Sequence, residues 1–439
     1  MKKLFKLRFG RFFRMKRDSF ISIVFLLIGI AALLAMGVYS PVTENYRSPS
    51  VGSSLSERAD TILKYNEENA TRYFWDCANP INGLVRDHSE SNSPSSISAV
   101  GFGMTSLIIG YENGWFTRSE VYDRILTTLN YFNNTTQKHG FYYHFINMYN
   151  GSSAYNSGFS SIDTTLFISG ALFAGQFFNN TPIQRLADRL YERINWKWMT
   201  NNTSLLNMCY YPDSGFSHYY WTDYSEALLM YILATGSPTH PLPVSDWEYW
   251  ISTWRENGQG DLRHWAASDE SMFTYLYAQA YINFKNLNFN YVGNLWNNSK
   301  RAIEYDISFA QSCTKYETFD QGYWGISASN GPTGYEAFGA YPGGTDGTVA
   351  PYAMIGAIPF VANQSKLAII NMWDIRNKTY STYGFVDAFN LGQNWFSQVY
   401  IGIDVGIEIL MTQDYFNGMV WKYFMEIPYV DNALLDLGV

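Results

Sequence analysis

Apolar residues recur at intervals of three and four along most of the chain, the spacing that places them on one face of an α-helix. Strand-type alternation is scarce, and loops rich in Gly, Asn, Pro and Tyr separate the helical segments. The pattern predicts helices near 55–75, 98–112, 118–132, 162–178, 182–194, 224–235, 244–256, 269–286, 292–311, 349–358, 364–374, 402–414 and 418–426.

So many helices without a convincing break predict one all-α domain over residues 55–439, built as a ring of paired helices. The inner helices of such a ring are buried on all sides, and its cleft lies at one end, among loops and helix starts. Two smaller helical bundles are the alternative architecture.

The amino terminus has a different pattern. Residues 1–18 carry eight Lys and Arg, and Ser19–Thr43 contains no charge. The apolar stretch Phe20–Val38 matches the roughly 20 residues that cross a bilayer. We therefore expect a basic cytoplasmic leader at 1–18, a transmembrane anchor at 19–39, a linker at 40–54, and the main domain outside the cell. A cleaved signal peptide, which would give a secreted protein, is the competing interpretation.

Net charge and cysteine content limit the classes of molecule that the protein can bind. Without the leader the chain has 22 Lys and Arg against 37 Asp and Glu, a net charge of about −15. This acidic balance argues against nucleic acid and permits a neutral glycan. Three distant cysteines show no metal-binding spacing, and ten Asn-x-Ser/Thr sequons fit an exported, glycosylated surface.

The aromatic content is high, with 14 Trp, 35 Tyr and 30 Phe. Sugar-binding clefts use Trp and Tyr because each ring offers an apolar face with a polar edge. Oligomer interfaces use the same residues, so composition alone leaves both open.

Two acids stand out because they fall on the apolar faces of their helices. Glu226 shares a stripe with Leu229 and Met230. Asp163 shares one with Leu166 and Phe167. Two inward-facing carboxylates suit hydrolysis of a glycosidic bond, in which one protonates the leaving oxygen and the other activates water. The alternative for each is a capping role at its own helix start.

Five segments combine acids, aromatics and glycines in loops or at helix starts. From them we select the candidate substrate-binding residues Trp75, Arg86, Asp87, Tyr142, His144, Trp221, Tyr224, Trp324, Asp346, Asp387, Trp395 and Asp404. For Asp346, Asp387 and Asp404 a turn or capping role is the default. The chain has no Gly-x-Ser-x-Gly elbow, no Gly-rich phosphate loop and no His-Glu-x-x-His sequence. A carboxylate metal site stays open.

The ordered segments resemble the glucoamylase-like glycoside hydrolases, which include bacterial β-1,2-glucanases. The resemblance runs collinearly over residues 60–435 and is carried by the runs 74–76, 83–87, 99–106, 140–145, 161–164, 185–193, 226–241, 346–351 and 384–390. It implies an (α/α)6 barrel, inverting hydrolysis of a neutral glucan or oligosaccharide, a general acid at Glu226 and a base or water-positioning group at Asp163. It implies no metal and no organic cofactor.

The chain departs from that family pattern at several polar positions. Gly158 stands where relatives often carry Glu, and Asn147 and Asn330 stand where they often carry Asp. Tyr275 and Gln279 replace paired His residues, and Val405-Gly406-Ile407 replaces Gln-Gly-Pro. Two other functions therefore stay open on the same fold: a catalytically inactive glycan-binding surface protein, and a glycosyl-transferring enzyme.

Overall fold

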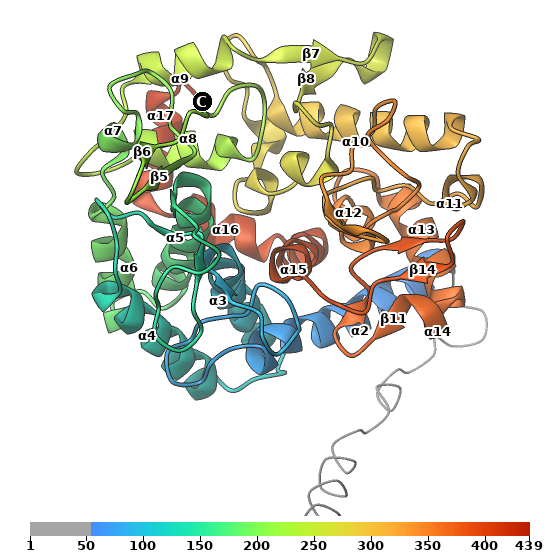
Figure 1. Ribbon diagram of the computed structural model, residues 1–439, viewed down its shortest axis with the longest axis horizontal. Helices are drawn as coiled ribbons and strands as arrows, with labels where there is room; N and C mark the ends of the chain where they lie inside the picture. Colours follow the sequence, from blue (N-terminus) through green and yellow to red (C-terminus); the bar gives the residue numbers. More distant parts are fainter. Residues whose placement is uncertain (1–53) are drawn as a thin grey trace, which may run out of the picture. The chain divides into compact units, whose positions relative to one another are not determined.

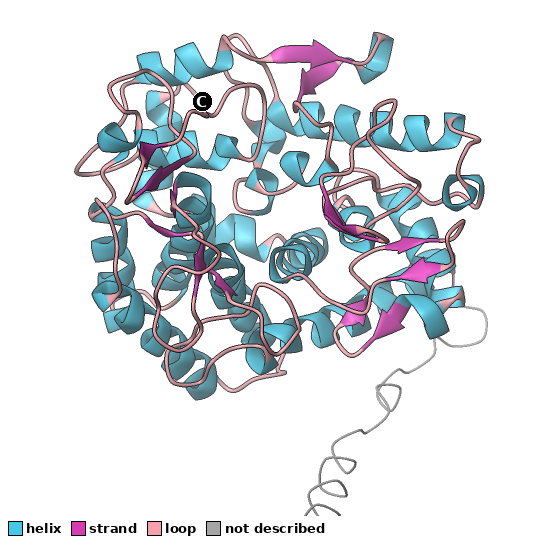
Figure 2. Ribbon diagram, viewed as in Figure 1, coloured by secondary structure: helices cyan, strands magenta, loops and turns pink. Residues whose placement is uncertain are grey.

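The computed structural model describes residues 54–439, whose secondary structure is mostly helical (Figures 1 and 2). The longer helices are α2 (Leu55–Asp76), α3 (Ile97–Glu112), α4 (Arg118–Asn134), α5 (Ser161–Phe177), α6 (Pro182–Glu192), α8 (Ala227–Thr235), α9 (Val244–Ile251), α10 (Leu295–Ser312), α12 (Pro351–Gly356), α13 (Ala362–Asp374), α15 (Gly402–Asn417), α16 (Met419–Met425) and α17 (Pro428–Asp436). Shorter ones are α7 (Trp196–Met199), α11 (Glu317–Asp320) and α14 (Arg376–Thr379).

Outer and inner segments alternate along the chain. Helices α2, α4, α6, α10 and α13 bury one face and expose the other. Helices α3, α5, α8 and α12 are buried along nearly their whole length, as is most of α15. Figure 1 looks down on α15, which is seen end-on near the middle of the ring, with α3, α5, α12 and α16 around it. This alternation is the predicted ring of paired helices.

Glycines let the inner helices approach one another closely. A Cβ added at Gly101 of α3 would overlap the carbonyl oxygen of Leu166 in α5, and one at Gly170 would overlap the carbonyl oxygen of Gly101. On α15, a Cβ at Gly402 would meet Ala99, and one at Gly406 would meet Phe102. Backbones that touch in this way bring the starts of α3, α5 and α15 together.

The helix predicted over 269–286 is wrong. Three 3₁₀ turns replace it: η2 (Met272–Tyr275), η3 (Ala278–Ala280) and η4 (Phe284–Asn286); a further turn, η1 (Gly260–Leu262), lies upstream. Backbone groups here bond to distant partners, since Met272 N–H donates to the Ile326 carbonyl and Phe273 N–H to the Ser327 hydroxyl. The segment is buried on nearly every side, so its apolar pattern carries little helical periodicity.

The other helix predictions agree with the structure to within a few residues, except that α9 ends at Ile251 and α12 is short. Helices α7, α11, α14 and α17 were not predicted.

Short strands fill the loops. They are β1 (Ser95–Ser96), β2 (Tyr142–Tyr143), β3 (Phe145–Ile146), β4 (Phe159–Ser160), β5 (Cys209–Tyr211), β6 (Gly215–Phe216), β7 (Arg255–Asn257), β8 (His264–Ala266), β9 (Ser329–Gly331), β10 (Gly334–Glu336), β11 (Tyr380–Ser381), β12 (Gly384–Phe385), β13 (Phe389–Asn390) and β14 (Trp395–Phe396). All paired strands are antiparallel within the described residues, in one four-stranded sheet of order β2-β4-β5-β6 and several two-stranded ones. Strands β1 and β4 lead directly into α3 and α5, and fix where these helices begin.

The predicted leader and transmembrane anchor lie outside the described residues, as does all but the last residue of the predicted linker. Within residues 54–439, no helix has the length and apolar character needed to cross a membrane.

The close helix crossing gives a stability prediction. Replacing Gly170 by Ala forces apart the backbones of α3 and α5, so we expect a loss of unfolding free energy of about 1–3 kcal/mol, measured by chemical denaturation. The matched control is Gly392→Ala, where the added Cβ has no neighbour closer than 3.6 Å. Equal stability of the two variants would contradict the assigned packing.

Candidate active site

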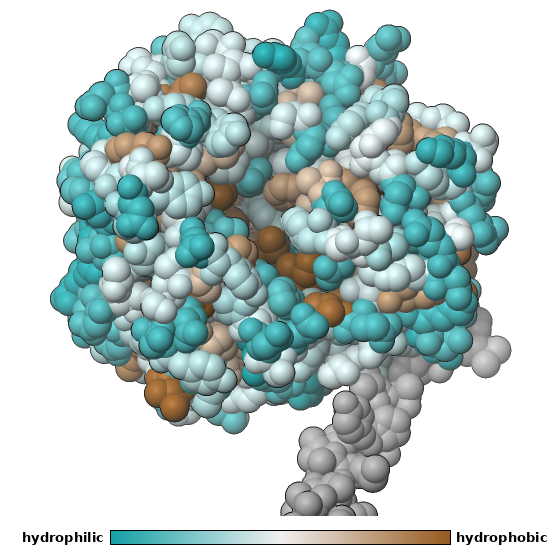
Figure 3. All heavy atoms as spheres, viewed as in Figure 1, coloured by the Kyte–Doolittle hydropathy of each residue, from teal (hydrophilic) through white to brown (hydrophobic). Residues whose placement is uncertain are grey.

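The starts of three inner helices supply the central carboxylates. Asp163 lies in the first turn of α5, Asp404 in the first turn of α15, and Glu226 at the N-cap position of α8. The positive end of each helix dipole therefore faces the same region of the domain. Figure 3 shows this face of the domain hollowed near its centre.

Asp163 contacts polar side chains from three segments. The hydroxyls of Ser98 and Ser160 each donate to its carboxylate at 2.5 Å, and His144 Nε2 lies 3.3 Å from Oδ1. Hydrogen bonds of this kind stabilise the charged form of a carboxylate. The capping role considered for Asp163 is wrong, because Ser160 is the N-cap of α5 and its side chain accepts the Asp163 N–H.

Glu226 has a different environment. It is half-buried and makes no side-chain capping hydrogen bond, so the capping alternative fails here as well. Burial, and to a smaller extent the charges of Asp269 and Asp163, raise the pKa of Glu226 from an ordinary value of 4.5 to about 8. At neutral pH this carboxyl holds its proton.

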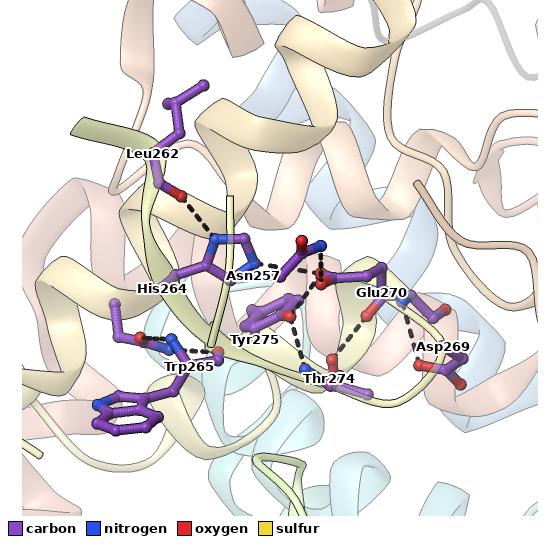
Figure 4. A network of polar contacts seen from close by, with 11 residues as sticks. Asn257, Leu262, His264, Trp265, Asp269, Glu270, Thr274 and Tyr275 are labelled. Atoms are coloured by element: carbon purple, nitrogen blue, oxygen red, sulfur yellow. Dashed lines mark hydrogen bonds and ion pairs between the residues drawn. The ribbon is translucent and has the colours of Figure 1, made fainter. Parts of the chain in front are cut away.

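A polar network supports the segment that carries Asp269 (Figure 4). The Glu270 carboxylate accepts hydrogen bonds from Asn257 at 2.6 Å and from the Tyr275 hydroxyl at 2.8 Å, and lies 3.2 Å from His264 Nε2. Asp269 accepts the Ser271 N–H at 3.1 Å. The Tyr275 ring stacks on Tyr224, two residues before Glu226, with centroids 5.3 Å apart.

Asp87 and His144 lie on the Asp163 side of the site. Burial raises the pKa of Asp87, the charges of His88 and His144 lower it, and that of Asp163 raises it. The His144 ring stacks on Phe145 at a centroid distance of 3.7 Å. Asp87, His144 and Asp163 thus form one electrostatic cluster.

Asp387 and Asp404 form a second acidic pair. Asp387 accepts the Asn330 N–H at 2.9 Å, and burial raises the pKa of Asp387 to about 6. Burial and the charge of Asp387 hold the pKa of Asp404 well above its usual range. Asp387 Oδ1 and Asp404 Oδ2 are both buried without a hydrogen-bond donor, and each carboxyl shifts the pKa of the other. The pair therefore shares one proton at neutral pH.

The structure brings together Glu226, Asp163, Asp87, His144, Asp387 and Asp404. Loss of solvation first, and then charges from both sets of acids, raise the pKa of Tyr277 and of Tyr335, so both tyrosines lie near these groups. Tyr277 is buried, whereas Tyr335 is 57% exposed. Sequence reasoning missed these two tyrosines and Asp269. It also missed Ser98 and Ser160, although both lie in or beside the motifs that were singled out.

Several predicted substrate contacts lie elsewhere. Tyr224 and Trp324 are buried, and the Tyr142 hydroxyl donates to the Phe132 carbonyl in the core. Trp75 stacks on Phe116 and lies under Arg124, beside the outer helix α4. Tyr142, Tyr224 and Trp324 are buried against protein, so a structural role replaces the predicted one. Trp75 is half-buried, and its substrate contact stays a prediction.

Three further candidates have positioning roles or lie at the rim. Trp221 is nearly buried and donates to the Ser161 hydroxyl at 2.9 Å, which ties the approach to α8 to the start of α5. Asp346 accepts the Thr348 N–H within a turn. Trp395 is half-exposed on β14.

Within residues 54–439, no group of three or more His, Cys, Asp or Glu side chains is arranged to hold a metal ion.

Residues 218–428 match the family model Glycoamylase, which is described as "Putative glucoamylase". This span includes Glu226, Asp387 and Asp404. Together with the structural neighbours, it confirms the predicted resemblance to the glucoamylase-like glycoside hydrolases and their (α/α)6 fold.

The chain is 24% identical over 442 residues to an exo β-1,2-glucooligosaccharide sophorohydrolase (non-reducing end) of Parabacteroides distasonis, covering 90% of this chain. The chain spans 60% of that relative's length. An endo-β-1,2-glucanase of Chitinophaga pinensis, solved with sophorotriose and glucose, has a TM-score of 0.82 at 27% identity over 86% of this chain and 98% of its own. A β-1,2-glucanase of Parabacteroides distasonis has a TM-score of 0.81 at 22% identity, covering 86% and 60%. These relatives are named as glycoside hydrolases.

The raised pKa of Glu226 predicts a pH-dependent stability difference. Between pH 4.5 and about 8 the folded protein keeps the proton on Glu226, whereas the unfolded chain loses it. The free energy of unfolding therefore falls as pH rises through this window. We expect Glu226→Gln to gain stability relative to wild type by up to about 1.4 kcal/mol per pH unit within it, and to keep a constant difference above it. Denaturation of both proteins at a series of pH values measures this.

A flat difference across the window would contradict the raised pKa. Glu248→Gln, which removes an exposed carboxylate from α9, is the matched control and should show almost no pH-dependent difference.

Proposed function

We propose that this chain is a glycoside hydrolase that cuts neutral β-1,2-linked glucan or oligosaccharide by inverting acid–base hydrolysis. One observation carries the proposal: a carboxyl that holds its proton at neutral pH, Glu226, lies within electrostatic range of Asp163, whose charged form is hydrogen-bonded. That is the pairing an acid and a base require. The named activities of the relatives support the choice of linkage.

The two carboxyls divide the reaction. Glu226 gives its proton to the glycosidic oxygen as the bond between that oxygen and the anomeric carbon breaks. A water on the opposite face attacks the anomeric carbon and passes its proton to Asp163. Inversion needs the two carboxyls about 6.5–9.5 Å apart, to leave room for that water.

The other acids bind the sugar. Because Asp387 and Asp404 share one proton, the pair can both donate to and accept from sugar hydroxyls. Asp87 and His144 provide similar contacts beside Asp163, and the neutral substrate adds no charge to this acidic cleft.

Substitution of the acid tests the proposal. We expect Glu226→Gln to lower kcat on β-1,2-glucan by about 10²- to 10⁴-fold, because an amide cannot donate the proton, with little change in KM. The measurement is release of reducing ends, with nuclear magnetic resonance of the first product formed. Inversion at a β-linkage gives the α-anomer first.

Matched variants separate the alternatives. Glu248→Gln should retain full activity. Equal activity of wild type and Glu226→Gln would remove Glu226 as the acid. If Asp404→Asn abolishes activity and Asp163→Asn does not, the base lies in the Asp387–Asp404 pair. Glycan binding without product from the wild type would favour the inactive glycan-binding protein, and transfer products would favour a glycosyl-transferring enzyme.

We further propose that the apolar stretch Phe20–Val38 anchors the protein, with the basic residues 1–18 in the cytoplasm and the main domain outside. The full chain should stay with membranes after alkaline carbonate washing, and external protease should reach the domain in intact cells. Release of a shortened, active protein into the medium would instead indicate cleavage.

A further inference from the structure

A pocket of about 510 Å³ opens beside the acid cluster, where no function has been assigned apart from the substrate contact expected of Arg86. The loops before α3 and before α5 line it. Arg86 precedes Asp87, and Asn147 follows His144 by three residues, so the loops that line the pocket also carry two residues of the Asp87–His144–Asp163 cluster. Its volume lies in the range of small-ligand sites, roughly 300–1,000 Å³.

Two exposed tyrosines supply aromatic surface to the pocket. Tyr149 is 82% exposed and Tyr155 69% exposed, and both line this pocket. Other tyrosines of this protein are equally exposed, but these two line one pocket together. A tyrosine suits a sugar because the ring covers its C–H face while the hydroxyl stays in water. The polar lining from Asn92, Ser91 and Arg86 offers donors for sugar hydroxyls.

The backbone that presents these tyrosines is fixed. The side-chain amides of Asn79 and Asn82 both donate to the Met148 carbonyl, at 2.8 and 3.0 Å, and join the two loops. Asn147 Oδ1 accepts the Tyr149 N–H at 2.9 Å. The backbone at Met148 and Tyr149 is therefore held in place before any ligand arrives.

Tyr155 is held by a strained turn. Tyr155 and Asn156 both have φ of +53°, in the left-handed region that ordinary residues avoid. Hydrogen bonds pay for this geometry: Ala154 N–H donates to the Phe145 carbonyl at 2.9 Å, and the Ser157 hydroxyl donates to the same oxygen at 2.9 Å. The Tyr155 ring packs edge-on against the ring of Phe145, with centroids 5.6 Å apart. Phe145 is the residue that follows His144 in the chain.

We infer that this pocket is a distal subsite that binds further glucosyl units of the same glucan chain, stacked on Tyr149 and Tyr155, while the bond to be cut lies at Glu226. The inference rests on the proposed function. It predicts that long chains are preferred over short ones, because only a long chain reaches from the acid cluster into the pocket.

The test is the dependence of kcat/KM on chain length, with β-1,2-linked gluco-oligosaccharides and the polymer as substrates. For the full chain, we expect Tyr149→Ala and Tyr155→Ala each to lower kcat/KM on the polymer by about 3- to 10-fold, the loss of one ring contact. The shortest cleaved oligosaccharide should be unaffected. Tyr149→Phe and Tyr155→Phe keep the ring and should restore the preference for long chains.

Tyr291→Ala is the matched control, since Tyr291 is 82% exposed, has φ of +69°, and lies outside the pocket. It should behave as wild type. Equal losses on short and long substrates, or no loss on either, would overturn the subsite.

A binding measurement separates this inference from the proposed function. Electrophoresis through a gel containing β-1,2-glucan should retard the wild type and Glu226→Gln, and retard the Tyr149→Ala/Tyr155→Ala double variant less. Retardation without cleavage by the wild type would refute the hydrolase and keep the subsite. Equal retardation of wild type and double variant, or none for either, would refute the subsite.

Discussion

The contact between the backbones of α3 and α5 governs the geometry of the site. Gly101 and Gly170 leave no room for side chains at this crossing, and Gly402 and Gly406 do the same between α3 and α15. Close contact lets Ser98 on one helix reach Asp163 on the next with a hydrogen bond of 2.5 Å. Larger residues would separate the helix starts, and the hydroxyl would no longer reach the carboxylate.

Burial sets the chemistry of the acids that this frame collects. Carboxyls placed in poorly solvated surroundings keep their protons unless donors stabilise the charge. Glu226 lacks such donors apart from its own N–H, and burial raises its pKa to about 8, whereas Asp163 has two hydroxyls and an imidazole nearby. Two chemically similar side chains thus have different surroundings, few donors at Glu226 and several polar neighbours at Asp163.

The sequence was sufficient for most of the helices, since their outer faces are polar and their inner faces apolar. It failed over 269–286, where burial on nearly every side and bonds to distant loops conceal the 3₁₀ turns. The central acids could be found because Glu226 and Asp163 fall on apolar stripes.

The supporting residues were harder to predict. Asp269 lies in a loop whose path depends on contacts with residues 339 and 340, and Tyr335 lies on the short hairpin of β9 and β10, where strand pattern is too brief to read. The aromatic residues gave false positives. Tyr224 and Trp324 are residue types that bind sugars, but both are buried in the core. Only a structure distinguishes a covered ring from an open one.

The Glu270 network has a consequence for stability. Its partners are Asn257 on β7, His264 on β8 and Tyr275 on η2, and all three meet at the buried carboxylate of Glu270, whose backbone has a φ of +49°. Losing any one of these contacts leaves a buried polar group with fewer partners, so β7, β8 and η2 are stabilised together. Asp269 and the Tyr275 ring, which stacks on Tyr224, lie within this group of segments, and besides burial the charge of Asp269 raises the pKa of Glu226. The proton affinity of the central acid is therefore coupled to the folding of a segment that does not contain it.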